Sequence, residues 1–191
     1  MAVPELAWLD RADEQVRAEV HALVGDVAAH GGAVGWLHVP ERAEVDAWLD
    51  EVLASGARLV LARIDGRVVG CGYWARQSAA VLRHNAEVRK VMAASTVRGR
   101  GVGRAVTAAL VEDADRAGVE LLQLDCRGNN HAALGLYADL GFVVSGRRPD
   151  AIAVGDLRFD QVLLHLDLRV RRAAGADVVR CGGRRGGPGS S

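Results

Sequence analysis

The sequence predicts a single α/β domain, and three observations lead to this prediction. With 191 residues, the chain is long enough to bury one sizeable core. An apolar run over 88–94 is followed by a glycine-rich turn and then by an alanine-rich helical pattern over 105–114. Asp65-Gly66 separates two further apolar runs, which is a strong hairpin signal. We therefore expect a mixed central sheet of about six to seven strands, flanked by about four helices.

The N-terminal half contains a short strand, two helices and a hairpin. Its predicted elements are a strand at 6–9, a helix at 12–30, a loop with Gly31, Gly32 and Gly35, a helix from Pro40 through Ala54, and strands at 58–64 and 68–74.

The C-terminal half continues the sheet. We expect a strand at 86–95, a helix at 101–117 that stops at Gly118, a strand at 119–126, a second helical segment, and antiparallel strands at 142–147 and 158–168. Residues 1–170 form the predicted domain. Residues 171–191 are a Gly/Arg-rich tail with almost nothing to bury, and we expect this tail to be disordered.

Charge and cysteine content narrow the class of protein. The 24 basic and 24 acidic residues balance, which argues against a nucleic-acid or anionic-membrane partner. Cys71, Cys126 and Cys181 are too scattered for a metal site, and no signal peptide is evident, so we expect reduced thiols and no metal. Because no apolar run approaches the ~20 residues of a membrane span, the prediction is a soluble, cytoplasmic protein.

The segment Arg98-Gly99-Arg100-Gly101-Val102-Gly103-Arg104 predicts an anion site. A glycine-rich turn between a strand and a helix lets backbone N–H groups and the helix dipole converge on one point. The spacing does not fit a P-loop, because no Lys-Ser or Lys-Thr pair follows. It does not fit a Rossmann turn either, because Arg104 stands where the third glycine belongs. A pyrophosphate-bearing ligand remains the expected occupant.

Two motifs together resemble one family. Arg98-x-x-Gly101-x-Gly103 is similar to the coenzyme A loop of the GNAT superfamily of N-acetyltransferases. Farther on, the segment from Asn130 to Phe142 resembles the N-x-x-A-x-x-L-Y-x-x-x-G-F pattern of that family. The resemblance implies a GNAT-like fold and the use of acetyl-CoA as co-substrate.

A narrower resemblance is to the tabtoxin resistance acetyltransferases, over roughly residues 28–168. It rests on four segments: Gly31 to Trp36, Ala86 to Met92, the glycine-rich loop and Leu121 to Asp125. The chain departs from the family at Ser95, where proline is frequent, so the corner between strand and loop is a point of expected difference.

The family resemblance assigns cofactor contacts. It implies that the loop from Arg98 to Arg104 holds the pyrophosphate and that the backbone of Val91, Met92 and Ala93 holds the thioester arm. Asn130 matches the asparagine that contacts the pantetheine arm, and the same residue type is also suited to capping a helix. The same motif implies that Tyr137 contacts the cofactor and is the candidate acid that protonates the departing thiolate, although a tyrosine that only packs on the sheet would fit the same pattern.

The resemblance makes Glu87 the candidate base, because it lies four residues before Val91, the offset at which several family members carry a catalytic glutamate. On a regular strand the side chains of 87, 89, 91 and 93 share a face, so Glu87 would point to the thioester. The alternative is a surface glutamate paired with Arg89 or Arg83. Asp125 is expected to assist or to bind the substrate amine, although a structural carboxylate would explain it too.

The remaining candidates either line the acceptor site or have no expected role in catalysis. Trp36 is a candidate wall of the acceptor site, together with Glu87 and Asp125. We interpret His84 and His131 as solvated and Cys126 as a small buried residue. The predicted function is acetyl transfer from acetyl-CoA to the primary amine of a small molecule, by direct attack in a ternary complex. A protein or peptide N-acetyltransferase and a non-catalytic acyl-CoA sensor are the alternatives, and a homodimer is expected.

Overall fold

The computed structural model describes residues 3–32, 35–36 and 38–173. The first elements are β1 (Glu5–Leu9), α1 (Glu14–Ala29), α2 (Arg42–Ala54), β2 (Arg58–Ile64) and β3 (Arg67–Arg76). The chain continues with β4 (Asn85–Ala93), α3 (Val102–Arg116), β5 (Leu121–Arg127), α4 (His131–Asp139), β6 (Val143–Val154) and β7 (Leu157–Asp167). Two short 3-10 turns, η1 (Ala80–Leu82) and η2 (Ser95–Val97), flank β4.

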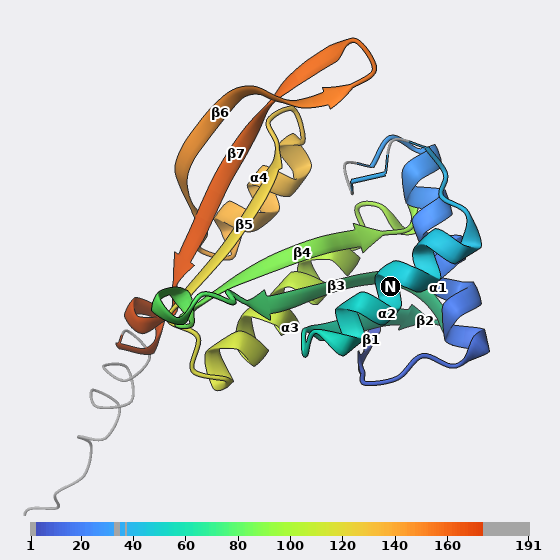
Figure 1. Ribbon diagram of the computed structural model, residues 1–191, viewed down its shortest axis with the longest axis horizontal. Coiled ribbons are helices and arrows are strands. Elements are labelled where there is room, and N and C mark those ends of the chain that lie inside the picture. The colour runs from blue at the N-terminus through green and yellow to red at the C-terminus, as the bar shows by residue number, and fades with distance from the viewer. Residues whose placement is uncertain (1–2, 33–34, 37, 174–191) are drawn as a thin grey trace, which may run out of the picture.

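The strands form one seven-stranded sheet in the order β1-β2-β3-β4-β5-β7-β6. Within the described residues, β4 and β5 are the parallel pair, and the other neighbours are antiparallel. Figure 1 shows the helices distributed over both faces of this sheet. The expected mixed α/β sheet is confirmed.

Alternating side chains of the strands build two cores. Leu59 and Leu61 of β2 pack with α1 and α2, whereas Val60 and Ala62 pack with α3. Tyr137 of α4 belongs to the α3 core. The sheet therefore has an α1/α2 face and an α3/α4 face, and every later statement about the site depends on which face a side chain occupies.

Some predicted boundaries were wrong for identifiable local reasons. The second helix starts at Arg42 rather than at Pro40, because Glu41 and Glu44 form a reciprocal capping box there. β6 extends to Val154, well past the predicted end at residue 147, and its pairing with β7 accommodates irregularities on the way. Residues 168–173 are helical, and 174–191 lie outside the described residues, so the disordered tail stays a prediction.

The sheet splits between β4 and β5. These strands pair only at Asn85–Leu121, Ala86–Leu122 and Glu87–Gln123. Beyond Glu87, the described residues of β4 do not pair with β5, and the two ribbons diverge in Figure 1. A slot therefore opens between the two central strands.

A β-bulge lies in β4 directly beside this slot. Tyr73 pairs with Arg89 and Cys71 pairs with Met92, so two residues, Lys90 and Val91, stand opposite Gly72 alone. Lys90 takes a left-handed φ of 53°, which is unusual for a residue other than glycine. The bulge shifts the alternation of side chains along the second half of β4.

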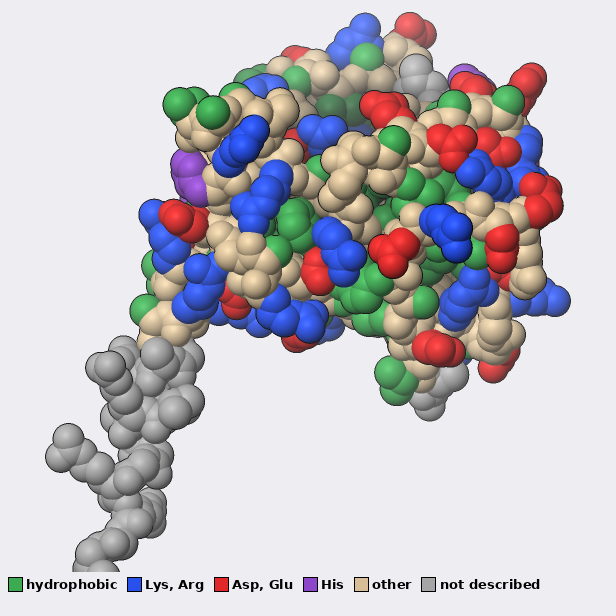
Figure 2. All heavy atoms as spheres, turned by 60° about the horizontal axis from the view of Figure 1, so that its bottom comes forward, with side chains coloured by type: hydrophobic (Ala, Val, Ile, Leu, Met, Phe, Trp, Pro, Cys, Tyr) green, Lys and Arg blue, Asp and Glu red, His purple; other side chains and the backbone are tan. Residues whose placement is uncertain are grey.

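The outer surface carries mixed charge. Figure 2 shows basic and acidic side chains interspersed over the face that it presents. Among the described helices, none is long and apolar enough to cross a membrane.

Candidate active site

A pocket of about 1080 Å³ occupies the slot between β4 and β5. Its walls come from the end of α1 and the segment after it, from 87–93 of β4, from the glycine-rich turn and the start of α3, from the end of β5, from α4, and from 151–154 of β6. The pocket brings together nearly all the residues predicted from the sequence.

The glycine-rich turn forms one end of the pocket. Gly99 and Gly101 have φ of 74° and 81°, and a Cβ at either would meet no atom within 4 Å. Gly101 caps α3 without any side-chain hydrogen bond, so the first N–H groups of that helix have no side-chain cap. An anion seated here would receive those hydrogen bonds and would meet the positive end of the helix dipole.

The arginines of the turn differ in position. Arg98 lines the pocket and donates to the His30 carbonyl at 3.3 Å. Arg104 also lines it and pairs with Asp139 at 3.0 Å. Arg100 is exposed and is not among the lining residues, so its predicted contact with the cofactor has the least support of the loop.

Ser95, which stands where the family often has proline, holds the corner between β4 and the glycine-rich loop by hydrogen bonds. Its N–H and hydroxyl donate to the two carboxylate oxygens of Asp26, at 2.6 and 2.7 Å. Burial by itself would raise the pKa of Asp26, but these two hydrogen bonds, with His30 and Arg98 nearby, lower that pKa below its usual value. The carboxylate of α1 thus fixes the turn that leads from β4 to the glycine-rich loop.

The bulge corrects one expectation about β4. Ala86 and Val88 belong to the α3 core, and Val91 and Ala93 pack against the same core, whereas Met92 is buried with α1 and α2. Glu87 therefore does not share a face with Val91 and Ala93, as a regular strand would require. The backbone of 91–93 still lines the pocket, which is the property that holding a thioester arm needs.

Glu87 and Asp125 meet on the α1/α2 face. Leu122 and Leu124 of β5 point into the α3 core, which places Asp125 on the opposite face, the one that carries Glu87. Glu87 pairs with Arg89 at 2.6 Å, so the alternative considered from sequence holds while Glu87 also lines the pocket. Gln161 of β7 donates to the Asp125 carboxylate.

The pKa of the Asp125 carboxyl is raised above its usual value by its surroundings. Loss of hydration raises the pKa of this carboxyl, and the negative charge of Glu87 raises it further, whereas Arg89 and Arg148 oppose the shift. Two carboxylates that repel each other across a pocket favour a shared cation or proton.

Tyr137 approaches the slot from the α3/α4 face. The residue is 8% exposed, its ring packs edge-on against that of Phe142 with 5.9 Å between the ring centroids, and it lines the pocket. Burial raises the pKa of the phenol, with added effects of Cys126 and Asp125, so the hydroxyl keeps its proton at neutral pH. Asn130 caps α4 by accepting from the Ala133 N–H at 3.2 Å and also lines the pocket, so both roles considered for it are compatible.

Trp36 and Lys90 form the remaining wall on the α1/α2 face. The Lys90 ammonium lies 3.7 Å from the centroid of the Trp36 ring, a cation–π contact. Trp36 in turn packs edge-on against Trp48 at 5.5 Å. Sequence reasoning placed Trp36 here but missed Lys90, although the chain has no other lysine. Ala33 and Val34 of the same predicted loop lie outside the described residues.

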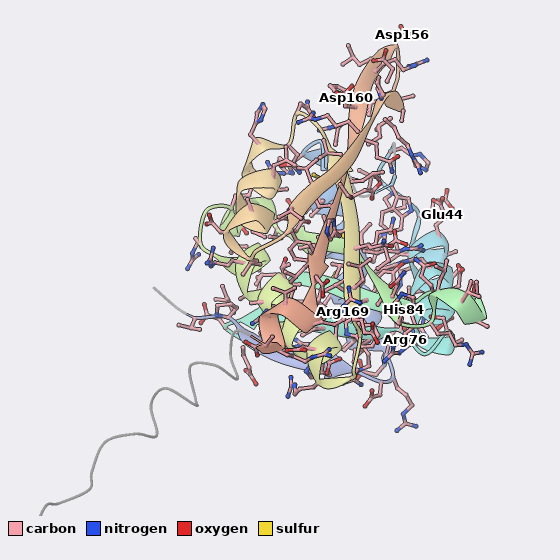
Figure 3. The ribbon with its side chains drawn as sticks, turned by 90° about the vertical axis from the view of Figure 1, so that its left-hand side faces the viewer. Glu44, Arg76, His84, Asp156, Asp160 and Arg169 are labelled. Atoms are coloured by element: carbon pink, nitrogen blue, oxygen red, sulfur yellow. The ribbon has the colours of Figure 1, made fainter. Side chains whose placement is uncertain are left out.

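Other titratable groups lie apart from this constellation or are inert. His84 and His131 are exposed, and Figure 3 places His84 near Arg76, far from Asp156 at the tip of the β6–β7 hairpin. Burial raises the pKa of the Cys126 thiol to about 11, so it stays protonated and is a poor nucleophile. Within the described residues no cluster of three His, Cys, Asp or Glu could hold a metal ion.

Comparison with known families agrees with this geometry. The model of the acetyltransferase (GNAT) family matches residues 17–142. The chain belongs to this family. The enzyme is thus an acetyltransferase whose acetyl donor is acetyl-CoA. Three features of the pocket fit this donor: the glycine-rich turn, the uncapped start of α3 and the open edge of β4.

Three similar proteins illustrate the range of relatives. An L-methionine sulfoximine/L-methionine sulfone acetyltransferase of Pseudomonas paraeruginosa is 28% identical over 169 residues, which are 82% of this chain and 95% of the relative. A ribosomal protein bS18-alanine N-acetyltransferase of Escherichia coli is 26% identical over 133 residues, covering 69% and 88%. The crystal structure of a GNAT phosphinothricin acetyltransferase from Sinorhizobium meliloti, in complex with acetyl-CoA, superimposes with a TM-score of 0.72 at 19% identity, covering 86% and 88%.

Proposed function

We propose that the protein transfers the acetyl group of acetyl-CoA to the primary amine of a small, amino-acid-like molecule. The observation that carries this proposal is the slot between β4 and β5, which has different chemistry on its two faces. The glycine-rich turn and Tyr137 lie toward α3 and α4, whereas Glu87 and Asp125 lie toward α1 and α2. Donor and acceptor can therefore approach from opposite faces and meet between the strands.

On the donor side, the turn from Gly99 to Gly103 binds the pyrophosphate, and the backbone of 91–93 aligns the thioester. Asn130 contacts the pantetheine arm from the start of α4. Backbone N–H groups are suited to this task because they are fixed before the substrate arrives.

On the acceptor side, Glu87 and Asp125 attract the ammonium of the acceptor. The raised pKa of Asp125 makes this pair a better proton acceptor near neutral pH than an ordinary aspartate. Once the amine has lost its proton, it attacks the thioester carbonyl carbon directly. No acyl-enzyme is required, in keeping with the protonated state of Cys126.

Tyr137 assists the departure of the sulfur. Its phenol is protonated and lies on the donor face, so it can donate a hydrogen bond and then a proton to the thiolate as the C–S bond breaks. A tyrosine whose pKa is raised acts late, when negative charge has developed on sulfur.

The size of the acceptor is the finer part of the proposal. The Pseudomonas paraeruginosa relative is an acetyltransferase of L-methionine sulfoximine and L-methionine sulfone, which are amino acids. Trp36 and 151–154 of β6 both line the pocket, and we assign them to the acceptor. The second candidate is a protein N-terminus, which the similarity to the bS18-alanine enzyme favours.

The test is release of free thiol from acetyl-CoA, with single acceptors drawn from amino-acid analogues, simple amines and short peptides. We expect thiol release that depends on an amino-acid analogue and falls by roughly tenfold or more in Tyr137→Phe. Tight cofactor binding without turnover on any acceptor would favour an acyl-CoA sensor. Turnover on peptides alone would favour the protein acetyltransferase.

A cytoplasmic location and a homodimer complete the proposal. Light scattering of the purified chain at micromolar concentration tests the second point, since a dimer has twice the mass of the 191-residue chain.

A further inference from the structure

We propose that Lys90 is a self-acetylation site: in the absence of an acceptor, the enzyme transfers the acetyl group to the side-chain amine of Lys90. The inference rests on the proposed function, because it uses the same donor and the same slot. It goes beyond it by assigning a covalent modification to the enzyme's own chain.

The first observation is the place of the amine. Lys90 lines the pocket, and its ammonium lies against Trp36, which packs in the α1/α2 core. That is the face from which the acceptor amine is proposed to arrive. Lys90 also directly precedes Val91, the first residue of the backbone segment assigned to the thioester arm. A primary amine of the enzyme is thus built into the acceptor wall, one residue from the proposed thioester segment.

The second observation is that the backbone is specially shaped at this residue. Lys90 is the residue of the bulge with a φ of 53°, a conformation that costs free energy for any side chain with a Cβ. Across from it, Gly35 also has a positive φ, and a Cβ there would come within 2.9 Å of the Lys90 Nζ. The absence of a side chain at Gly35 therefore leaves room for the Lys90 ammonium.

The third observation concerns residue choice. Lys90 is the single lysine of this chain, and all its other basic residues of the Lys/Arg type are arginines. Arginine would supply a positive charge and would bind a carboxylate better, but its guanidinium does not lose its proton and is not a nucleophile. Burial lowers the pKa of Lys90, which increases the fraction of neutral amine. Amine chemistry is the property that distinguishes lysine from arginine at this position.

The step is an ordinary aminolysis of a thioester. The Lys90 ammonium first gives a proton to the Glu87/Asp125 pair or to water. The Nζ lone pair then attacks the carbonyl carbon, the N–C bond forms and the C–S bond breaks. The sulfur leaves as a thiolate and takes up a proton from Tyr137 or from water. The products are an acetamide on Lys90 and free coenzyme A, so no further reactant is needed.

Acetylation has a consequence for the acceptor site. It removes the positive charge that Trp36 faces and adds an acetyl group to the wall of the pocket. We therefore expect preincubation with acetyl-CoA alone to lower later turnover of an amine in proportion to the acetylated fraction.

The experiment is mass spectrometry of the folded protein after incubation with acetyl-CoA and no acceptor. We expect the intact mass to rise by one acetyl group per chain, and peptide mapping to place that group on Lys90 rather than on the terminal amine. Lys90→Arg, checked for folding by its melting temperature, should gain no internal acetyl group and should not lose turnover during preincubation. The same protein unfolded in urea should gain none.

The outcomes separate this inference from the proposed function. Amine-dependent thiol release without acetyl on Lys90 would overturn self-acetylation and leave the acceptor proposal standing. Equal labelling of the urea-unfolded chain would also overturn it, because the reaction would then be uncatalysed. Acetyl on Lys90 in the folded protein, with no acceptor found in the panel, would support self-acetylation while the acceptor proposal fails.

Discussion

The two faces of the slot between β4 and β5 present different chemical groups, backbone on one face and side chains on the other. The α3/α4 face presents backbone: the glycine-rich turn, the first N–H groups of α3, and the edge of β4. The α1/α2 face presents side chains from distant parts of the chain, among them Trp36, Glu87, Lys90 and Asp125. The first face suits a donor with an invariant pyrophosphate and thioester. The second can be changed by substitution, which suits the choice of an acceptor.

Loss of one carboxylate of the Glu87/Asp125 pair should have the largest effect on turnover. Glu87→Gln removes one of the two carboxylates proposed to bind and deprotonate the acceptor, and we expect kcat to fall about 10²-fold, the usual contribution of a general base. Steady-state thiol release measures it. Glu5→Gln, on the exposed part of β1, is the matched control and should leave kcat unchanged. Equal losses in both variants would indicate a general defect rather than a site.

The donor face is tested by strain at a glycine. Gly101→Ala forces a side chain into a φ of 81° at the mouth of the anion site, at a cost of about 1–2 kcal/mol. We expect the KM for acetyl-CoA to rise about tenfold, which corresponds to about 1.4 kcal/mol. Gly118→Ala, at a φ of 76° beyond the other end of α3, imposes similar strain away from the pocket. It should lower the melting temperature without raising that KM; a rise in both would refute the assignment.

Asp26 connects the first helix to the donor loop. Asp26→Asn should destabilise the fold by about 1–3 kcal/mol at about pH 7, because two hydrogen bonds to a charged acceptor are weakened. The pKa of Asp26 is lowered in the folded state, so its ionised form contributes stability above its ordinary value of 3.8, and this contribution is lost as the pH falls below it.

Urea unfolding at several pH values measures this difference. The gap between wild type and Asp26→Asn should narrow as the pH falls through that range. Asp139→Asn, in an exposed pair with Arg104, should have a much smaller effect. A gap that stays constant to low pH would contradict the charged hydrogen bonds.

The smallest predicted effect is a shift in a pH profile. If Asp125 takes the proton, the acid limb of kcat/KM follows its raised pKa. Arg89 lowers that pKa in the wild type, so Arg89→Gln should move the limb to higher pH. Glu87→Gln removes the charge that raises it and should move the limb to lower pH, in the residual activity. Shifts in the same direction would exclude Asp125 as the group that titrates.

The donor face could be predicted from the sequence because its features are local. A turn with Gly99 and Gly101 and a helix that starts just after them need only neighbouring residues, and Asn130 and Tyr137 fall on one short motif. The acceptor face could be predicted only in part. Glu87 and Asp125 follow from strand positions, but their proximity depends on the register between β4 and β5.

Lys90 and the long β6 show what the sequence did not reveal. The bulge in β4 lies opposite Gly72 of β3, where α3 packs so closely that a Cβ on residue 72 would lie 2.9 Å from Val106. The pattern of apolar and polar residues along β4 does not predict this bulge. Likewise, Pro149 and Asp150 resemble a loop, yet β6 continues through them because β7 supplies a partner on both sides of the irregularity. Tertiary pairing outweighs the local signal in both cases.

The most direct test of the acceptor assignment is a competition in one vessel. Limiting acetyl-CoA is offered to the enzyme with equal concentrations of L-methionine sulfoximine and of a short peptide that begins with alanine, and the acetylated products are counted by mass spectrometry. The two-faced slot predicts that the acetyl group appears predominantly on the free amino acid, and that Glu87→Gln forms this product about 10²-fold more slowly. Predominant acetylation of the peptide would contradict the assignment and identify a protein N-acetyltransferase.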